Sequence, residues 1–257
     1  MKQEENIKYW NKKAREATND NQLTHQDLFQ KQLELNFIST HLKSNTDVLE
    51  VGCGNGFITE FLCQYVNHVD AFDASDEMIK RASLRLQRKN CNLFVKKLPS
   101  PSPEGLKPFY DAIISVRVLI NLESRNAQSK AIKWIASKLK PGGIFLLLEG
   151  CKEGLNSIND LRTAAGMKPI KTAEYNINIE KSWLEQNAEH HFYISQKDGI
   201  GTYDFLTRFF YPLLTGEDKV QYNTDFHEAA LKAEKVTPKN TYKFLFSRLL
   251  MYKFIKR

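Results

Sequence analysis

Apolar residues along the chain change their spacing near residue 46. In residues 1–45 they recur at helical intervals in a polar background, which predicts two helices joined by a polar turn around Asn19–Gln22. Beyond that point, short apolar runs alternate with amphipathic segments. The runs predict the strands DVLEV (47–51), HVDAFD (68–73), CNLFVKK (91–97), YDAIISV (110–116) and IFLLLEG (144–150).

Helices are predicted between most of these strands, up to about Val66, at about 75–89 and at about 124–139. The proline-rich stretch 99–105 is expected to be a surface loop, and Pro141-Gly142-Gly143 a turn. Strands that are apolar on both faces and separated by helices indicate a parallel sheet with right-handed crossovers.

The last third of the chain extends this pattern. It predicts helices near 155–165 and 180–189, a strand at 190–196, an aromatic-rich helical insert at about 202–236 and a closing strand at 247–255. The predicted fold is therefore α/β, a Rossmann-like doubly wound, mostly parallel sheet with flanking helices, a helical N-terminal cap and a helical insert near the C-terminus. No internal repeat or long linker divides the chain, so we expect 1–257 to form a single domain.

Composition fits this class, with 42% hydrophobic and 26% charged residues. No apolar stretch follows a basic start, so no signal peptide is expected. The longest apolar run, Ile144–Leu148, is far shorter than the roughly 20 residues that span a bilayer. The cysteines are scattered, without a C-x-x-C pair or histidines at metal-ligand spacing. A reduced, cytoplasmic, metal-free protein is expected.

The net charge of +7 is concentrated at one end of the chain. Lys232 to Arg257 contains eight basic residues and one acid, Glu234, while the remainder is balanced. Such a face is usually a solvated surface, although it could also attract anionic glycans, phosphorylated substrates or RNA. Charge alone gives no reason to expect a nucleic-acid partner.

The most informative stretch is VLEVGCGNGFIT (48–59), in which a buried strand leads into a glycine turn and a helix. Glycine allows positive φ and close approach of a ligand, and the helix start presents free N–H groups. The G-x-G-x-G spacing and Glu50 before the turn disfavour a pyrophosphate and suit the ammonium of an amino acid. Asp73 ends the second strand, where a carboxylate can accept hydrogen bonds from both ribose hydroxyls. A nucleoside without phosphates, linked to an amino acid, matches this polarity.

Four segments, VLEVGCGNGFIT, AFDASDEMIKRA, FYDAIIS and LKPGGIFLLLEG, resemble in order and spacing the motifs of class I S-adenosylmethionine (SAM)-dependent methyltransferases. The resemblance covers about 45–150. It makes 1–45 a helical cap, 46–150 the cofactor-binding core and 151–257 the substrate-side elements with the last strands. The cofactor residues it implies are Glu50, Gly52, Cys53, Gly54 and Gly56 for methionine, Asp73 for ribose, Ala74 and Met78 for adenosine, and Val116 beneath the sulfonium.

One position departs from the family. Many relatives bind adenine with an Asp near the end of the third strand, where this chain has Lys97 and Leu98. Adenine is then expected to meet backbone groups and apolar side chains. Each assignment has a structural alternative: a tight turn for the glycines, a helix N-cap for Asp73 and ordinary helix packing for Met78.

Acceptor residues are sought after the fourth strand. The N/D-P-P-Y/F motif of base and glutamine methylation is absent there. The R-x-L-x-N-L segment resembles a subgroup of small-molecule methyltransferases, which implies that Arg117 and Asn121 face the acceptor. The alternative is a salt-bridging Arg and a helix-capping Asn.

Further candidates come from aromatic and histidine positions. The stretch GTYDFLTRFFYPLL (201–214) predicts a lid in which Arg208 pairs with an anionic substrate group, or else an aromatic core stripe. His191 could act as a base or be structural. The remaining substrate candidates are Tyr9, Tyr175, Asn176, Tyr203 and Tyr211, with Tyr9 and Trp10 on a helix that could close over SAM or simply pack.

The favoured function is O- or N-methylation of a small molecule with SAM as cofactor. The preferred acceptor is a sugar or phosphorylated metabolite of anionic character. The alternatives are an RNA methyltransferase, a non-catalytic SAM-binding protein and an NAD-dependent dehydrogenase. The dehydrogenase is disfavoured by Glu50 and by the glycine spacing.

Overall fold

The computed structural model describes residues 3–20, 23–24, 26–86, 90–100, 104–238 and 241–257. Parts of four sequence predictions fall outside these residues: the turn at 19–22, the helix end at 89, the loop at 99–105 and the basic segment around 239–240. In the described part of the chain, no helix has both the length and the apolar character needed to cross a bilayer.

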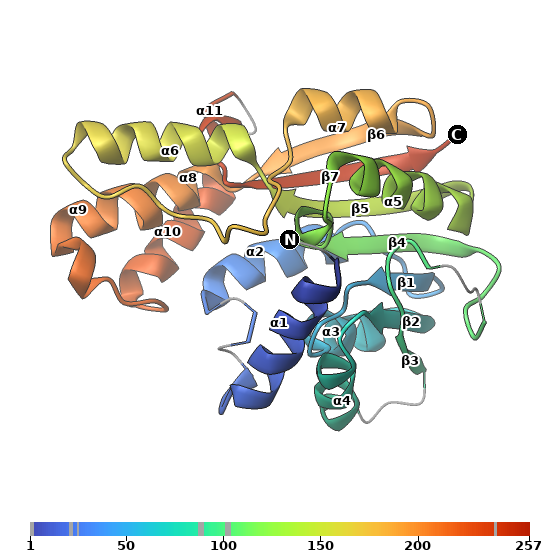
Figure 1. Cartoon of the computed structure of the whole chain (residues 1–257). Coiled ribbons are helices and arrows are strands. Elements are labelled where there is room, and N and C mark those ends of the chain that lie inside the picture. Colours follow the sequence, from blue (N-terminus) through green and yellow to red (C-terminus); the bar gives the residue numbers. More distant parts are fainter. Residues whose placement is uncertain (1–2, 21–22, 25, 87–89, 101–103, 239–240) are drawn as a thin grey trace.

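One seven-stranded sheet organises the molecule (Figure 1). Its strands stand in the order β3-β2-β1-β4-β5-β7-β6. Only β7 runs antiparallel, between β5 and β6, and the remaining pairs are parallel. The strand bounds are β1 Asp47–Val51, β2 His68–Asp73, β3 Cys91–Val95, β4 Tyr110–Val116, β5 Leu139–Gly150, β6 Phe192–Gly199 and β7 Leu249–Lys256. The predicted mostly parallel sheet is confirmed.

Helices cover both faces of the sheet, as alternating side chains along each strand require. On β1, Leu49 points into a cluster with Ile132 of α5 and Leu184 of α7, while Val48 points into a cluster with Phe37 of α2 and Leu62 of α3. The helices outside the insert are α1 Gln3–Glu16, α2 Leu28–Ser39, α3 Phe57–Tyr65, α4 Asp76–Arg85, η2 Leu119–Asn121, α5 Arg125–Lys138, α6 Lys152–Ala164, α7 Lys181–Ala188 and α11 Thr241–Leu245.

The predicted helical insert is present and lies at one end of the molecule, beside α2 and α6 (Figure 1). It contains α8 Gly201–Asp204, a π-helical turn η3 Phe205–Phe210, α9 Tyr211–Thr215, η4 Glu217–Lys219 and α10 Asp225–Val236. The strand that follows α11 returns to the sheet as β7, so the insert interrupts the path between β6 and β7.

Several strand boundaries differ from the sequence prediction, and two of these differences involve turns. β5 begins at Leu139, so the expected turn Pro141-Gly142-Gly143 lies inside the strand, next to an irregularity in its pairing with β4. The strand predicted at 190–196 begins at Phe192, after a turn in which the N–H of His191 bonds the carbonyl of Ala188. At 141–143, pairing with the neighbouring strands thus outweighed the preference of the local residues for a turn.

Candidate active site

A cavity of about 360 Å³ opens at the carboxyl ends of β1, β2 and β4. Its wall combines residues of α1, of α2, of the glycine turn, of the segment after β4 and of the loop between α6 and α7. Ligands in open α/β sheets bind at this edge, and the volume lies within the range of about 300–1,000 Å³ of small-molecule sites. It is the candidate site.

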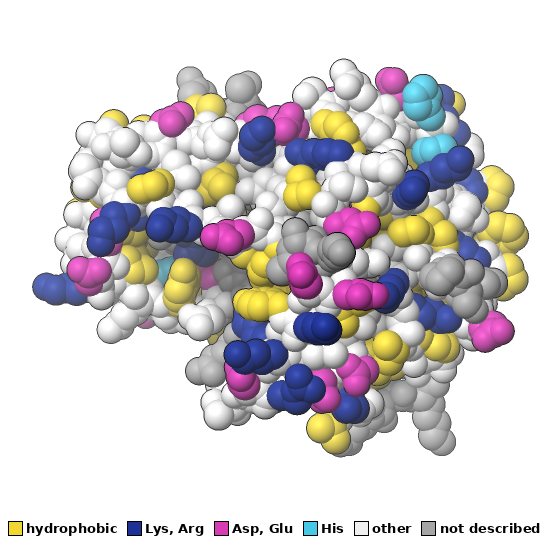
Figure 2. Space-filling view, viewed as in Figure 1, with side chains coloured by type: hydrophobic (Ala, Val, Ile, Leu, Met, Phe, Trp, Pro, Cys, Tyr) yellow, Lys and Arg dark blue, Asp and Glu magenta, His cyan; other side chains and the backbone are white. Residues whose placement is uncertain are grey.

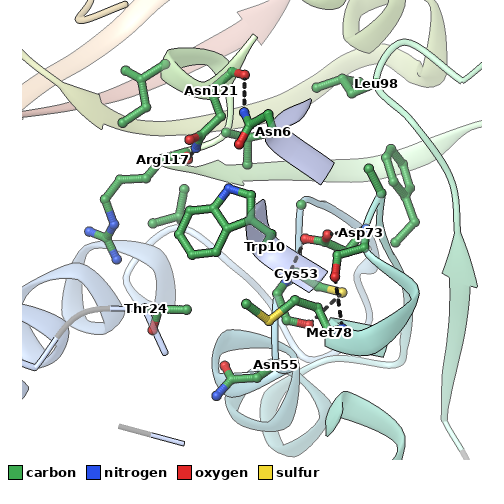
Figure 3. Close-up of a pocket in the computed structure, with 18 of the residues that line it drawn as sticks. Asn6, Trp10, Thr24, Cys53, Asn55, Asp73, Met78, Leu98, Arg117 and Asn121 are labelled. Carbon is green, nitrogen blue, oxygen red and sulfur yellow. Dashed lines mark hydrogen bonds between the residues drawn. The ribbon is translucent and has the colours of Figure 1, made fainter. Parts of the chain in front are cut away.

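The glycine turn forms one side of the cavity (Figure 3). Gly52, Gly54 and Gly56 all have positive φ, at 70°, 53° and 77°. A Cβ on Gly52 would stand 2.4 Å from Cγ2 of Val118, so this position excludes any side chain. Gly52, Cys53 and Gly54 line the cavity as expected.

Gly56 differs from the prediction, because it is not among the lining residues. It precedes α3, and a Cβ there would meet the Cβ of Ala82 on α4 at 3.0 Å. The glycine is thus required for close packing of α3 on α4. It does not itself form a ligand surface.

Glu50 is buried at the end of β1, and its carboxylate lines the cavity. The hydroxyl of Thr59 donates a hydrogen bond of 2.5 Å to it. Burial raises the pKa of Glu50 to about 7, although the Thr59 hydrogen bond acts in the opposite direction. A buried acid that titrates near neutral pH is poised to ionise when a cation enters.

Asp73 ends β2 on the adjacent part of the wall. The N–H of Gly54 donates to its Oδ2 at 2.9 Å and the N–H of Ser75 to its Oδ1 at 2.8 Å. Burial raises the pKa of Asp73 in spite of these backbone hydrogen bonds. The N-cap of α4 is Ser75, whose hydroxyl accepts from the N–H of Met78. The structural alternative for Asp73 is therefore wrong.

The residues predicted to contact adenosine line the cavity, with one change. Ala74, Met78 and Leu98 line the cavity, but the lysine beside Leu98 that does so is Lys96 and not Lys97. Side chains alternate along an extended segment, so Lys96 and Leu98 share one side while Lys97 points into solvent.

Arg117 and Asn121 both line the cavity after β4, together with Val116. Arg117 has a positive φ of 54°, and its guanidinium is hydrogen-bonded to the buried carboxylate of Glu34 on α2. Burial alone would lower the pKa of Arg117, and the Glu34 carboxylate outweighs it and raises that pKa. Both acceptor candidates of this segment thus reach the cavity, with Arg117 already paired.

A buried glutamate shapes the same segment. The carboxylate of Glu149, at the end of β5, accepts the N–H groups of Val118 and Leu119 at 2.8 and 2.7 Å. Burial raises the pKa of Glu149 to about 7. Glu149 acts on the cavity only through the turn that it holds.

The helix α1 and the loop before α7 close the other side (Figure 3). Trp10, Tyr175 and Asn176 line the cavity. The ring of Tyr9 lies 5.1 Å from that of Tyr175, but Tyr9 is half-exposed and lies outside the lining. Tyr9 therefore backs the aromatic wall and does not form its surface.

Several polar lining residues were not predicted, notably Asn6, Lys31 and Glu34. Asn6 stands one helical turn before Trp10, and the side chains of Lys31 and Glu34 share the buried positions of α2 with Phe37. For Asn6, its position in phase with Trp10 was a signal that could have found it, whereas α2 has no clear apolar stripe to reveal Lys31 and Glu34.

The predicted lid residues Tyr203, Arg208 and Tyr211 do not line the cavity, so their substrate role is wrong. Arg208 is only 6% exposed and pairs with the carboxylate of Asp27, which also accepts from the Tyr203 hydroxyl at 2.6 Å. The ring of Tyr211 stacks on Phe226 at 4.8 Å. These side chains fix the insert to α2, in keeping with the alternative of an aromatic core stripe.

His191, which was predicted as a possible base, does not line the cavity. It lies in a separate surface hollow with Lys130 and Lys133. Because β6 runs parallel to β5, the residue before Phe192 stands at the amino edge of the sheet, opposite the cavity. The structure therefore places His191 away from the candidate site, in keeping with the alternative of a structural histidine.

The basic C-terminal segment is largely paired within the structure. Lys243 contacts Asp198 and Glu234, and Arg248 contacts Asp204. On the face seen in Figure 2, basic and acidic side chains are interspersed. Lys243 and Arg248 therefore hold the segment to the rest of the chain.

Comparison with known proteins agrees with this geometry. Residues 48–143 match the model of a family described as a methyltransferase domain. A relative from Methanothermobacter thermautotrophicus, named probable cobalt-precorrin-6B C(15)-methyltransferase (decarboxylating), is 31% identical over 46% of this chain and 61% of its own length. A ubiquinone biosynthesis O-methyltransferase from Shewanella sp. is 25% identical over 63% of this chain and 70% of its own length.

Solved structures extend the likeness to the whole chain. The N-methyltransferase NodS from Bradyrhizobium japonicum WM9, solved with S-adenosyl-L-homocysteine (SAH), superposes with a TM-score of 0.61 at 14% identity, covering 98% of each chain. The chain has the fold of class I SAM-dependent methyltransferases. The match of residues 48–143 to a methyltransferase domain agrees with the family expected from the four sequence motifs.

Proposed function

We propose that the protein transfers the methyl group of SAM to a small molecule, by O- or N-methylation. The observation that carries the proposal is a pair of carboxylates in the cavity of a methyltransferase fold, the buried Glu50 and the partly buried Asp73, on either side of the glycine turn. The curated relatives support it by their names, as a precorrin and a ubiquinone-pathway methyltransferase.

The lining residues fit SAM group by group. Glu50 suits the ammonium of its methionine part, and Asp73 suits its ribose hydroxyls. Met78 and Leu98 offer apolar contact to adenosine, with Lys96 nearby. Val116 would lie beneath the sulfonium, next to the segment that carries Arg117 and Asn121.

SAM supplies an electrophilic methyl group, so the chain needs mainly to hold an acceptor in line with the S–CH₃ bond and to exclude water. The side chains of α1 and of the Tyr175 loop cover the cavity and can do both. No described residue near Arg117 and Asn121 is a histidine, so proton removal need not be assigned to an imidazole.

The narrower expectation of a sugar or phosphorylated metabolite is weakened in one respect, because Arg208 pairs with Asp27 and does not line the cavity. An anionic group on the acceptor keeps separate support, because Lys13, Lys31 and Lys96 line the cavity. Lys31 is almost fully buried, and burial lowers its pKa. An anionic group on SAM or on the acceptor would offset that cost.

The test combines titration and turnover. Calorimetry should give saturable binding of SAM and SAH to the wild type, and SAH should form when SAM and a protein-free extract of the source cells are added. Binding without SAH formation would favour a non-catalytic SAM-binding protein. SAH formation only with RNA, at an affinity that falls steeply with salt, would favour an RNA methyltransferase.

A further inference from the structure

Three asparagine side chains bring unpaired oxygen atoms into the cavity wall. The Oδ1 atoms of Asn6, Asn121 and Asn176 are buried and have no hydrogen-bond partner within the described part of the chain. Asn6 is only 7% exposed. Buried polar atoms are normally hydrogen-bonded, so three orphans in one cavity indicate a ligand that donates hydrogen bonds.

The orientation of two of these amides is fixed by their partners. The Nδ2 of Asn6 donates to the carbonyl of Asn121 at 2.6 Å, and the Nδ2 of Asn121 donates to the carbonyl of Arg117 at 2.5 Å. A carbonyl oxygen only accepts, so the nitrogen of each amide must face it. The remaining atom of each side chain is therefore an acceptor oxygen.

The three asparagines lie on neighbouring segments of the cavity wall. Asn6 and Asn121 are joined by their hydrogen bond, drawn in Figure 3. The N–H of Ile177, next to Asn176, bonds the carbonyl of Ile120, next to Asn121. The rings of Trp10 and Tyr175 lie 6.5 Å apart on the same side of the cavity, so the acceptor oxygens border an aromatic wall.

We propose that these asparagines bind a primary amine and that the enzyme is an N-methyltransferase for it. The inference rests on the proposed function. Asn6 and Asn121 would each accept one N–H bond, which leaves the nitrogen lone pair free for the methyl group. An alcohol has a single O–H and would leave one of the two oriented oxygens unpaired, at a cost in binding.

The step balances without a further reactant. The amine lone pair forms a C–N bond to the methyl carbon as the C–S bond breaks, and that electron pair neutralises the sulfonium to give SAH. The product is an N-methylammonium that loses one proton to water. Arg117 is already paired with Glu34, whereas the ammonium of Lys31 in the wall favours the neutral, nucleophilic form of the bound amine.

Chemical blocking of amines tests the proposal in the whole protein. The protein-free extract is divided, and one half is acetylated with an N-hydroxysuccinimide ester and then treated with hydroxylamine to remove O-acetyl groups. We expect SAH release with the untreated half and at least a tenfold loss with the acetylated half. Equal SAH release from both halves would refute the amine as acceptor but would still support the proposed methyltransferase function. No release from either, with SAM bound, would remove the proposed function and this inference with it.

Variants give an independent readout. Asn6→Leu and Asn121→Leu should lower kcat/KM for the extract amine at least tenfold while the Kd for SAM stays within twofold. The matched control is Asn126→Leu, an exposed asparagine on α5 outside the cavity, which should behave as wild type. If the two cavity variants weaken SAM binding as much as turnover, the orphan oxygens serve the cofactor and the proposal is wrong. Unchanged kcat/KM would equally refute it.

Discussion

The guanidinium of Arg208 and the carboxylate of Asp27 form a buried ion pair between the insert and the residue that precedes α2. Asp27 also caps α2 by accepting the N–H of Gln30 at 2.9 Å. The next turn of this helix presents Lys31 and Glu34 to the cavity. The insert thus contributes to the site by fixing α2, although its own aromatic residues do not reach the cavity.

Arg208→Ala should therefore destabilise the fold. Loss of one partner leaves the Asp27 carboxylate buried without its cation, which costs about 3–5 kcal/mol. Urea denaturation followed by circular dichroism measures this change. Lys232→Ala is the control, because Lys232 and Glu228 form an exposed pair whose loss should leave the denaturation midpoint nearly unchanged. Equal midpoints for both variants would contradict the structural role of Arg208.

The sequence was sufficient for the sheet and for most of the cofactor wall. Short apolar runs predicted the first five strands. The glycine turn placed Glu50 and Asp73 on one cavity because the carboxyl ends of parallel strands share an edge. The first inference needs only the local sequence pattern, and the second needs only the rule that parallel strands end at the same edge of the sheet.

Residues that depend on packing between distant segments could not be placed. The local sequence around an arginine among aromatic residues is the same whether the arginine contacts a ligand or a buried acid from a distant segment. Arg208 contacts such an acid, Asp27. The histidine before β6 could be assigned to a strand end, but not to the amino or the carboxyl edge, without the direction of β6. Lys31 and Glu34 were missed because a helix buried on several sides has no clear polar face.

Asp73→Ala should weaken SAM binding by more than tenfold. Hydrogen bonds to a charged group contribute about 1.5–3 kcal/mol, and about 1.4 kcal/mol corresponds to a factor of ten. Calorimetric titration with SAM measures the effect. Asp76→Ala, which removes a half-exposed carboxylate from the first turn of α4, should leave the affinity unchanged. An unaltered Kd for Asp73→Ala would refute its assignment to the ribose.

Gly52→Ala should lose SAM binding and stability together. The new Cβ would overlap Cγ2 of Val118, in the cavity wall, at a residue that also has positive φ. Gly166→Ala is the control for φ alone, since Gly166 has φ +73° and a Cβ added there would meet nothing within 4 Å. We expect Gly166→Ala to cost about 1–2 kcal/mol with normal SAM affinity. Similar losses for both glycines would show that steric overlap at Gly52 is unimportant.

SAM affinity should rise with pH through the titration of Glu50. Burial raises the pKa of this carboxyl to about 7, so at pH 6 most of the ligand-free protein carries a neutral Glu50. The ammonium of SAM favours the ionised form, so binding releases a proton and strengthens as pH increases. Between pH 6 and pH 7.5 the affinity should increase about fivefold to tenfold, in line with the ionised fraction. Titrations in buffers of different ionisation enthalpy would count the released proton. Glu50→Gln cannot ionise at this position, so the variant should bind SAM more weakly and lose this pH dependence. If the affinity of the wild type for SAM does not change between pH 6 and pH 7.5, the assignment of the SAM ammonium to Glu50 is wrong.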